Sequence, residues 1–327
     1  MLKVAVTGAS GHIGNCLVRE LIKKDAEVKV LVHKSEYELA DPGIEVFYGD
    51  ILDPESLESF CKGVDVVYHC AALISIDNRR RRLVFETNVT GTKNMLEAAI
   101  KAGVKKFVHF SSIDAFQIDK TGEVITEESP LTEEKDSIYN FSKAKAEGLV
   151  MEAVLKGLNA VILSPTAVLG PYDSRGSYLG QALIKLYKNK FPALIPGGYN
   201  WVDVRDVVDA AIQSVDSGRS GERYILSGHF CTIKDLSVLI GKMSGNKPPR
   251  FVVSDYIVRL ICPFYQLYYL VTNAKPMFTC LSLKLLLSAP SNISCEKARD
   301  ELGYNSRELE ESLRDTFEWY KQNDYIN

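Results

Sequence analysis

The chain lacks the charge imbalance that is typical of nucleic-acid-binding proteins. Its 327 residues include 39 Lys or Arg and 42 Asp or Glu, which gives a formal net charge of −3 at pH 7. A weakly negative protein has no electrostatic attraction to a phosphate backbone. No nucleic-acid partner is therefore expected, and the single basic run, residues 79–82, is interpreted as a solvated helix start or a subunit contact.

The sequence also lacks the spacing of cysteines and histidines that marks metal sites. Seven cysteines are scattered without a C-x-x-C pair, and the five histidines are isolated, so no metal site is predicted. The number of cysteines is odd, and no signal peptide precedes the first predicted strand. These features favour reduced, mostly buried thiols in a cytoplasmic protein.

A long uninterrupted apolar run is missing as well. The most apolar late stretch, residues 256–272, contains Arg259, Pro263 and Gln266, so no transmembrane segment is expected. Three interpretations of this aromatic and aliphatic stretch stay open. It lines an apolar pocket, it rests on a membrane surface, or it is buried in the core of its own lobe.

The composition, 46% hydrophobic and 25% charged, is ample for a large core. In the first half, short apolar runs alternate with helical patterns. Predicted strands cover residues 3–7, 27–32, 44–48, 64–70, 104–110 and 160–163, and predicted helices cover 13–24, 84–102 and 139–156. The strands are near-continuous apolar runs, which indicates that both of their faces are covered. This βαβ rhythm predicts a parallel, doubly wound α/β sheet.

The rhythm ends after residue 163. Prolines and glycines between residues 165 and 198 predict a looped region, which is followed by a helix over 204–215 and a short strand over 223–226. The remainder is predicted to be mostly helical. The second half is therefore expected to form a smaller lobe that winds partly back onto the first sheet.

A glycine-rich turn follows the first predicted strand. Gly8, Gly11 and Gly14 have the spacing G-x-x-G-x-x-G and open the first predicted helix. Such a turn lets the backbone approach a pyrophosphate, and the helix N-terminus supplies N–H groups for the anion. The order of strand, turn and helix predicts a dinucleotide site in a Rossmann-type sheet. The predicted domains are a dinucleotide-binding core of residues 1–165, to which 202–227 return, and a substrate lobe of residues 166–201 and 228–327.

The residues after the second predicted strand favour NADP, with NAD as the alternative. An acidic residue about twenty positions beyond the glycines would bind the ribose of NAD, but no carboxylate occurs here before Glu36. Lys34 and His33 suit a 2′-phosphate instead, and Ser10 in the glycine turn can reach it.

A tyrosine and a lysine, Tyr139 and Lys143, stand four residues apart on a predicted helix. This spacing returns to the same helix face. A neighbouring ammonium lowers the pKa of a phenol from its ordinary value of about 10. A tyrosine perturbed in this way can exchange a proton with a substrate oxygen near neutral pH.

These motifs resemble those of the extended short-chain dehydrogenase/reductase family, and the resemblance runs essentially end to end. The matching segments are the glycine turn, Asp50 with Ile51, His69-Cys70-Ala71-Ala72, Asn88-Val89-Thr90-Gly91-Thr92, Ser111-Ser112, the Tyr139–Lys143 pair, residues 164–171 and residues 202–207. Ser164 stands where the family usually has an arginine.

The resemblance implies hydride transfer between a nicotinamide and a substrate carbon that bears oxygen. Tyr139 would exchange the proton, Lys143 would hold the nicotinamide ribose, and Ser112, with Ser111 as its competitor, would stabilise the developing alkoxide. Asn88 is expected to order the helix start and the nearby backbone. The implied cofactor-binding residues are Gly8, Ser10, Gly11, His12, Ile13, Gly14, His33, Lys34, Asp50, Ile51, Ala71, Ala72, Asn88, Tyr139, Lys143, Pro165 and Val168.

The family includes reductases, steroid dehydrogenases, sugar epimerases and sugar dehydratases. The Asp-Glu pair of the dehydratases would here be Ile113-Asp114, and an isoleucine cannot protonate a leaving hydroxyl. The apolar segment 251–270 favours a lipophilic ketone, aldehyde or secondary alcohol, as in the dihydroflavonol-reductase, aldehyde-reductase and 3β-hydroxysteroid-dehydrogenase-like branch.

Two other functions stay open. A nucleotide-sugar epimerase with recycled NAD is the main alternative. A non-catalytic NADP-sensing protein is less favoured, because such relatives typically lack the Tyr–Lys pair. The chain is expected to be a monomer or a homodimer, which would be paired through residues 84–102 and 139–156.

Overall fold

The computed structural model describes residues 2–326 apart from 34–40, 42, 76–79, 118–121, 135–136, 273–278 and 288. For residues 264–272, 281, 282, 284 and 285 it describes the backbone only.

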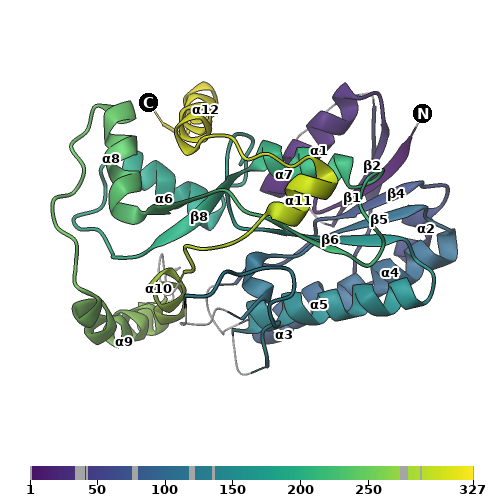
Figure 1. Ribbon diagram of the computed structural model, residues 1–327, viewed down its shortest axis with the longest axis horizontal. Coiled ribbons are helices and arrows are strands. Elements are labelled where there is room, and N and C mark those ends of the chain that lie inside the picture. Colours follow the sequence, from purple (N-terminus) through teal and green to yellow (C-terminus); the bar gives the residue numbers. More distant parts are fainter. Residues whose placement is uncertain are drawn as a thin grey trace.

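A seven-stranded parallel sheet forms the centre of the larger part of the molecule (Figure 1). Its strands, in spatial order, are β3 (Ile44–Tyr48), β2 (Glu27–Val32), β1 (Lys3–Thr7), β4 (Val66–His69), β5 (Lys106–Phe110), β6 (Ala160–Pro165) and β9 (Arg223–Leu226). All strands are parallel, but the order in which the chain adds them changes sides at β1: β2 and β3 lie on one side of it, and β4 and the later strands on the other. This parallel, doubly wound arrangement confirms the predicted fold class. Ligands of such sheets bind at the carboxyl ends of the strands beside this switch point.

Helices cover both faces of this sheet (Figure 1). One face packs against α1 (His12–Lys23), α7 (Val204–Gln213) and α11 (Glu296–Leu302). The other packs against α2 (Pro54–Cys61), α4 (Gly91–Ala102) and α5 (Ile138–Leu155). The buried aliphatic strands between these layers explain why the sequence shows near-continuous apolar runs.

One strand departs from that expectation. The side chains of Val46 and Tyr48 in β3 are 37% and 68% exposed. The prediction that every strand is covered on both faces is wrong here, because β3 is the edge strand of the sheet.

The predicted helix over residues 84–102 consists of three segments. It starts as α3 (Arg81–Phe85), passes through a π-helical turn at Glu86–Thr90, and continues as α4. Such π turns occur often at functional sites. This one contains Asn88, one of the predicted site residues.

The second lobe contains a three-stranded sheet that the sequence analysis did not predict. Its strands are β10 (His229–Thr232), β8 (Gly198–Asp203) and β7 (Ala167–Leu169). Helices α6 (Tyr178–Tyr187), α8 (Ile233–Ser244) and α12 (Leu309–Gln322) pack with it around Trp201 and Phe317. The predicted loop over residues 165–198 is therefore wrong in part. Strands of three to six residues between prolines and glycines give no period long enough to recognise.

Two further helices, α9 (Asp255–Thr272) and α10 (Cys280–Leu287), form the α9–α10 hairpin. Cys262 and Cys280 are joined by a disulfide, with a Cα–Cα distance of 5.6 Å. The expectation that all cysteines are reduced is wrong for this pair, because the hairpin brings residues 18 positions apart together. Within the part of the chain that the structure describes, no helix is long and apolar enough to cross a membrane.

Candidate active site

The predicted glycine turn connects β1 to α1, and two of its glycines are required by close backbone packing. Gly8 has φ +69°, and a Cβ there would lie 2.6 Å from the backbone nitrogen of Ala71. A Cβ on Gly14 would lie 2.2 Å from the carbonyl oxygen of Gly8. The backbone N–H of Gly11 donates to that same oxygen at 2.9 Å. A side chain at Gly14 would therefore push α1 away from the turn after β1, and one at Gly8 would collide with the backbone that follows β4.

The start of α1 fits the phosphates of a dinucleotide. Gly11 is its N-cap, no side chain caps the first N–H groups, and the first turn contains no acidic residue. Unsatisfied N–H groups at the start of a twelve-residue helix favour an anion. The half-buried side chains of Ser10 and Ile13 flank this turn. The His12 ring bonds to the carbonyl oxygen of Pro171 at 2.9 Å, so it ties the turn to the loop after β7.

At the adjacent strand ends, His33 after β2 meets Asp50 after β3. Their Nδ1 and Oδ2 atoms are 3.2 Å apart, and Asp50 also accepts from the N–H of Leu52 at 2.9 Å. The side chain of Ile51 packs on Gly91 at the start of α4. Lys34, the other predicted contact for a 2′-phosphate, lies outside the described residues.

A buried histidine that the sequence analysis gave no specific role organises the end of β4. The His69 ring bonds to the Thr7 hydroxyl at 2.8 Å through Nδ1 and to the Thr92 hydroxyl at 3.0 Å through Nε2. Burial, with the charge of Lys143 second, lowers its pKa to about 3. The imidazole is therefore neutral, and it joins β1, β4 and α4 below the predicted Ala71-Ala72 segment. The N–H of Ala71 donates to Thr7 Oγ1 at 3.2 Å, and Ala72 is half-buried beside it.

Asn88 holds the loop after β4 in place. Its Nδ2 donates to the Leu73 carbonyl at 3.2 Å and to Ser142 Oγ at 2.9 Å, and its Oδ1 accepts from the Leu73 N–H at 2.7 Å. These bonds connect the π-helical turn to α5. The prediction that Asn88 orders nearby backbone is confirmed.

Helix α5 carries the Tyr139–Lys143 pair. It begins after Ser137, whose side chain accepts from the N–H of Asn140 as an N-cap, so Tyr139 lies in the first turn. One turn later, Lys143 is 5% exposed and its Nζ donates to the Phe110 carbonyl oxygen at 2.7 Å. This bond fixes the ammonium at the carboxyl end of β5.

The electrostatics of the pair differ from the expectation. The pKa of Tyr139 is raised rather than lowered, first by burial and then by the nearby carboxylate of Asp114, while a hydrogen bond with Ser112 opposes the shift. Burial lowers the pKa of Lys143 to about 8, against the opposing charge of Glu147. The sequence revealed the spacing of the pair but not its desolvation, which is the largest effect on both groups.

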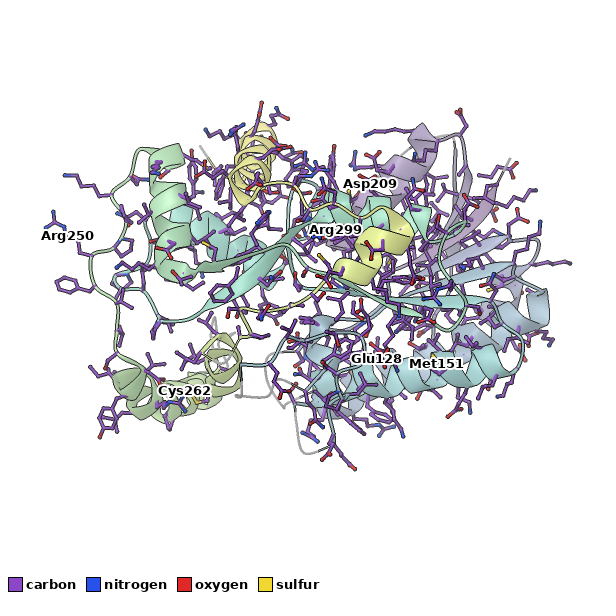
Figure 2. The ribbon with its side chains drawn as sticks, in the orientation of Figure 1. Glu128, Met151, Asp209, Arg250, Cys262 and Arg299 are labelled. Carbon is purple, nitrogen blue, oxygen red and sulfur yellow. A yellow bond between two sulfur atoms is a disulfide. The ribbon has the colours of Figure 1, made fainter. Side chains whose placement is uncertain are left out.

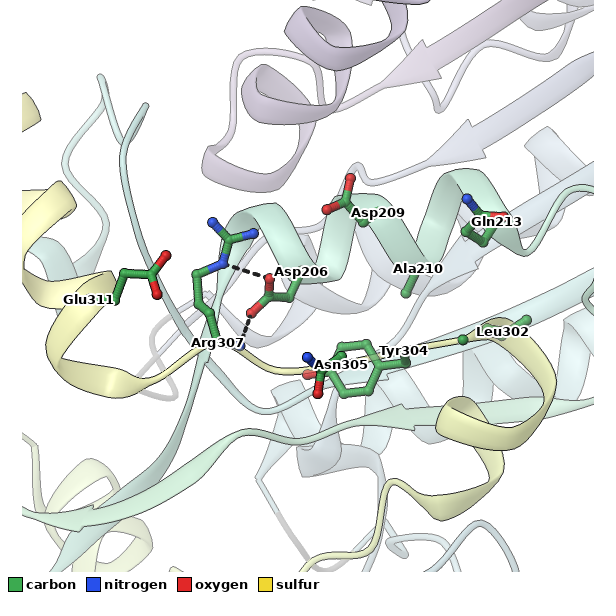
Figure 3. A pocket seen from close by; sticks show the side chains of 10 residues that line it. Asp206, Asp209, Ala210, Gln213, Leu302, Tyr304, Asn305, Arg307 and Glu311 are labelled. Atoms are coloured by element: carbon green, nitrogen blue, oxygen red, sulfur yellow. Dashed lines mark hydrogen bonds and ion pairs between the residues drawn. The ribbon is translucent and has the colours of Figure 1, made fainter.

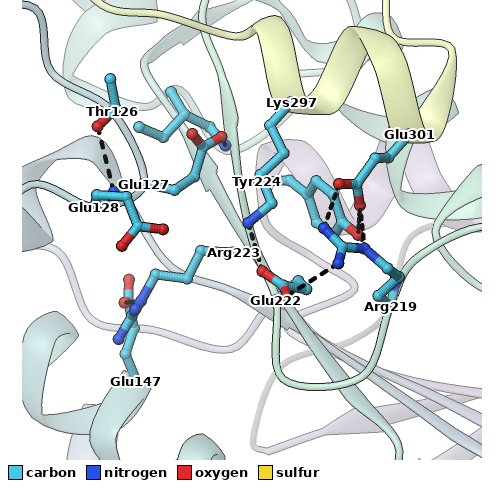
Figure 4. Close-up of polar contacts among 11 residues, drawn as sticks. Thr126, Glu127, Glu128, Glu147, Arg219, Glu222, Arg223, Tyr224, Lys297 and Glu301 are labelled. Atoms are coloured by element: carbon cyan, nitrogen blue, oxygen red, sulfur yellow. Dashed lines mark hydrogen bonds and ion pairs between the residues drawn. The ribbon is translucent and has the colours of Figure 1, made fainter.

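Ser111 and Ser112 point to different partners. Ser111 donates to the buried carboxylate of Glu147, which also accepts from Arg223 Nε at 2.6 Å (Figure 4). Ser112 is in hydrogen-bond contact with Tyr139 and accepts from the N–H of Asp114 at 3.1 Å. Ser112 is therefore on the side of Tyr139, and Ser111 belongs to a structural ion pair between α5 and β9.

Asp114 was not among the predicted site residues. Its Oδ2 lies 3.4 Å from Ser112 Oγ, and burial raises its pKa. Its charge also contributes to raising the pKa of Tyr199, in β8, to about 12, although burial is the larger cause. The sequence signals were its position two residues after Ser112 and its place at the second position of the dehydratases' Asp-Glu pair.

Two further predicted residues lie where the core meets the second lobe. Pro165 ends β6 and pairs with Leu226 of β9. Val168 lies in β7 and pairs with Val202 of β8. Both positions follow the carboxyl end of the parallel sheet, the edge at which doubly wound proteins bind ligands.

A separate polar depression of about 390 Å³ lies on the side of the sheet that α7 and α11 cover (Figure 3). Its walls are α7 and residues 302–311, and it is crossed by the ion pair of Asp206 with Arg307, whose Oδ1 and Nε are 2.7 Å apart. It contains none of the predicted site residues. Among the described residues, no three His, Cys, Asp or Glu side chains are grouped as metal ligands.

Comparisons with known proteins agree with this arrangement. The "Sterol demethylase protein B" of Methylococcus capsulatus is 30% identical over 327 residues, which cover 98% of this chain and 99% of that protein. The "Putative dihydroflavonol 4-reductase" of Synechocystis sp. is 26% identical and covers 98% and 95%. Among solved structures, the crystal structure of gox2253 superposes with a TM-score of 0.86 at 28% identity and covers 99% of both chains.

A family model matches most of the chain. Residues 4–227 fit the model described as the NAD dependent epimerase/dehydratase family. The resemblance inferred from the motifs is therefore confirmed. The chain belongs to the NAD-dependent epimerase/dehydratase family, within the extended short-chain dehydrogenases/reductases.

Proposed function

We propose that this protein is an NADP-dependent oxidoreductase that interconverts a carbonyl and a secondary alcohol on a lipophilic small molecule. The observation that carries the proposal is the hydrogen bond between Ser112 and Tyr139, with the buried ammonium of Lys143 one helical turn further along α5, on the Phe110 carbonyl. This cluster lies at the carboxyl end of β5, two strands from the glycine turn. A proton donor, an oxyanion donor and a cation are thus held together on rigid elements.

When bound, a nicotinamide cofactor would supply or accept the hydride. Gly8, Gly11 and the first turn of α1 would hold its phosphates. Tyr139 would donate its phenolic proton to the carbonyl oxygen of the substrate. Its raised pKa keeps the phenol protonated at neutral pH, as a proton donor in a reduction requires.

Two other side chains would assist that proton transfer. Ser112 would donate a hydrogen bond to the substrate oxygen as negative charge develops there. Lys143 would favour the phenolate that Tyr139 leaves behind, because a nearby cation stabilises the charged form. Asn88 would act only through the backbone that it holds.

The choice of a lipophilic substrate is supported by the relatives and by the second lobe. The names of the two curated relatives refer to a sterol and to a dihydroflavonol. The second lobe contains the α9–α10 hairpin, whose residues 261–272 include no charged side chain. Apolar surroundings suit a substrate of low polarity.

NADP is proposed over NAD because His33 follows β2 and no carboxylate occurs before Glu36. Asp50 is the opposing feature, since its carboxylate lies beside His33.

A nucleotide-sugar epimerase with recycled NAD is the second candidate, favoured by the family description. We further propose a cytoplasmic monomer or homodimer with a core of residues 1–165 and 202–227 and a substrate lobe formed by the rest.

The test is NADPH and NADH oxidation against a panel of ketosteroids, flavanonols, aliphatic ketones and aldehydes. Turnover is expected with NADPH, and Tyr139→Phe should lower kcat by about 10² to 10⁴ while NADPH fluorescence shows unchanged binding. Ser112→Ala should lower kcat by a factor of about 10². Ser111→Ala is the matched control, because it removes the neighbouring hydroxyl from the structural side of the strand.

Near-native turnover in Tyr139→Phe would reject the proton-donor role. Tight cofactor binding without turnover on any panel member, but with epimerisation of a nucleotide sugar, would establish the second candidate. Tight binding with neither activity would favour a cofactor-sensing protein.

A further inference from the structure

The α9–α10 hairpin, with the residues just before it, presents an apolar surface that the described part of the chain leaves exposed. Six side chains between residues 251 and 261 are exposed, with fractions of 75% for Phe251, 42% for Val252, 76% for Tyr256, 44% for Ile257, 57% for Leu260 and 53% for Ile261. We call these six side chains the α9 face. A cluster of this size on one short segment differs from the single exposed apolar residues that are normal on soluble proteins.

The α9 face is held in position by the fold. The N–H of Leu194 donates to the Phe251 carbonyl at 2.8 Å, and the N–H of Val253 donates to the Leu194 carbonyl at 2.9 Å. The opposite side of α9 is the buried one, where Val258 and Cys262 pack against Leu283 of α10. Over residues 255–262, α9 therefore has two apolar sides, and among the described residues only one of them is used for packing.

The geometry of the helix joins the exposed residues of α9 itself into one stripe, which Phe251 and Val252 precede in the chain. Ile257, Leu260 and Ile261 are spaced by three and four positions, so they lie on one face. Val258 and Cys262, also four apart, define the face toward α10. In Figure 1, α9 forms an outer corner of the second lobe, at the end of the molecule farthest from α2.

The charge around the α9 face has the opposite sign to that of the whole chain. Residues 247–261 include three Lys or Arg and a single acidic residue, Asp255, whereas the complete chain has a net charge of −3. Lys247 and Arg250 are exposed, and Figure 2 shows Arg250 directed outward from the segment that connects α8 to α9. Arg259 is paired with Asp255 at 2.9 Å.

An exposed apolar helix face with a basic border matches the surface of an anionic lipid bilayer. Apolar side chains enter the boundary between headgroups and acyl chains, and basic side chains pair with anionic headgroups. A second copy of this chain is disfavoured as the partner. A symmetric contact through the α9 face would bring two basic borders together.

We propose that the protein docks on anionic lipid membranes through the α9 face, with Lys247 and Arg250 in the segment that leads into it. The protein would stay peripheral. This docking does not require the proposed reductase activity, and the two are tested by different readouts.

The experiment is flotation of the full-length protein with vesicles of phosphatidylcholine alone or with 30% phosphatidylglycerol (a composition on the order of natural anionic surfaces). Binding is expected only to the anionic vesicles, and it should weaken as salt is raised. Leu260→Asp and Ile257→Asp should each lower partitioning at least about tenfold. Lys247→Glu with Arg250→Glu should lower it further, by roughly fivefold for each residue.

Val238→Asp is the matched control. Val238 is 40% exposed on α8 of the same lobe, outside the α9 face, so the same charge is added without a change in partitioning. Turnover of a small water-soluble carbonyl without vesicles should be unchanged in all these variants.

Equal binding by Leu260→Asp and Val238→Asp would overturn the proposal, as would absence of binding to anionic vesicles. Self-association that Leu260→Asp abolishes, without vesicle binding, would assign the α9 face to a second copy instead.

Discussion

Lys143 combines deep burial with a functional charge. Its Nζ is fixed on the Phe110 carbonyl, and desolvation lowers its pKa to about 8. Loss of the proton as pH rises through this value would remove the cation at the carboxyl end of β5. The neighbouring carboxylate of Glu147 opposes the desolvation, so the ammonium remains the main form at neutral pH.

The pH dependence of cofactor use should report this group. The kcat/KM for NADPH reflects ionisations of the free enzyme, and it should fall about tenfold per pH unit above about 8 as Lys143 loses its charge. Lys143→Met should lower the rate at neutral pH and abolish this alkaline limb. A flat wild-type profile between pH 7 and 9.5 would show that the charge of Lys143 is not required.

At the residue scale, the sequence was informative about spacing and uninformative about environment. The four-residue separation of Tyr139 and Lys143 follows from helix geometry alone. The pKa shift of Tyr139 depends on burial and on Asp114, which come from different parts of the fold. The choice between Ser111 and Ser112 likewise depends on Glu147, 36 positions beyond Ser111.

At the scale of elements, strands of the central sheet were the most predictable. The bounds of β1, β2, β3 and β9 match the predicted runs. For β1, β2 and β9 the apolar run follows from burial between helices, whereas β3 matched although two of its side chains are exposed. Strands β7, β8 and β10 were missed, since they are short and lie among prolines and glycines. The pairing of Cys262 with Cys280 was missed because it is set by how α9 packs on α10.

That disulfide gives a testable property of the α9–α10 hairpin. Peptide mapping without reductant should find Cys262 linked to Cys280 and the other five cysteines free, as they are in the structure. Reduction should lower the stability of the hairpin by about 3 kcal/mol for a loop of this length, measured by amide hydrogen exchange in α9. The Cys262→Ala, Cys280→Ala double variant is the control, because it should not respond to reductant. Alkylation of both cysteines in the unreduced protein would contradict the pairing.

At the scale of the whole molecule, polar contacts join the last part of the chain to the core. Arg205 Nη1 lies 2.6 Å from Asp315 Oδ2, which connects α7 to α12. Asp206 accepts from the N–H of Arg307 at 2.8 Å and from its Nε at 2.7 Å. The sequence indicated Asp206 as part of a motif, but its partner is 101 positions away and could not be identified from spacing.

The pair of Asp206 and Arg307 should therefore make a large contribution to global stability. Arg307→Leu should lower the free energy of unfolding by about 3 kcal/mol at pH 7, because the side chain of Asp206, 4% exposed, would keep an uncompensated charge. The pKa of Asp206 is already raised by burial against the opposing charge of Arg307, and loss of Arg307 would raise it further. Because the pKa is raised in the folded state, the destabilisation caused by the buried carboxylate is relieved as pH falls through that pKa. The loss of unfolding free energy in Arg307→Leu, measured by urea denaturation, should therefore become smaller between pH 7 and pH 5. Adding Asp206→Asn should recover part of this loss at pH 7. Arg314→Leu, at an exposed position of α12, should change stability by less than about 0.5 kcal/mol. An Arg307→Leu deficit that stays constant over this pH range would show that the side chain acts through packing and not through the charge of Asp206.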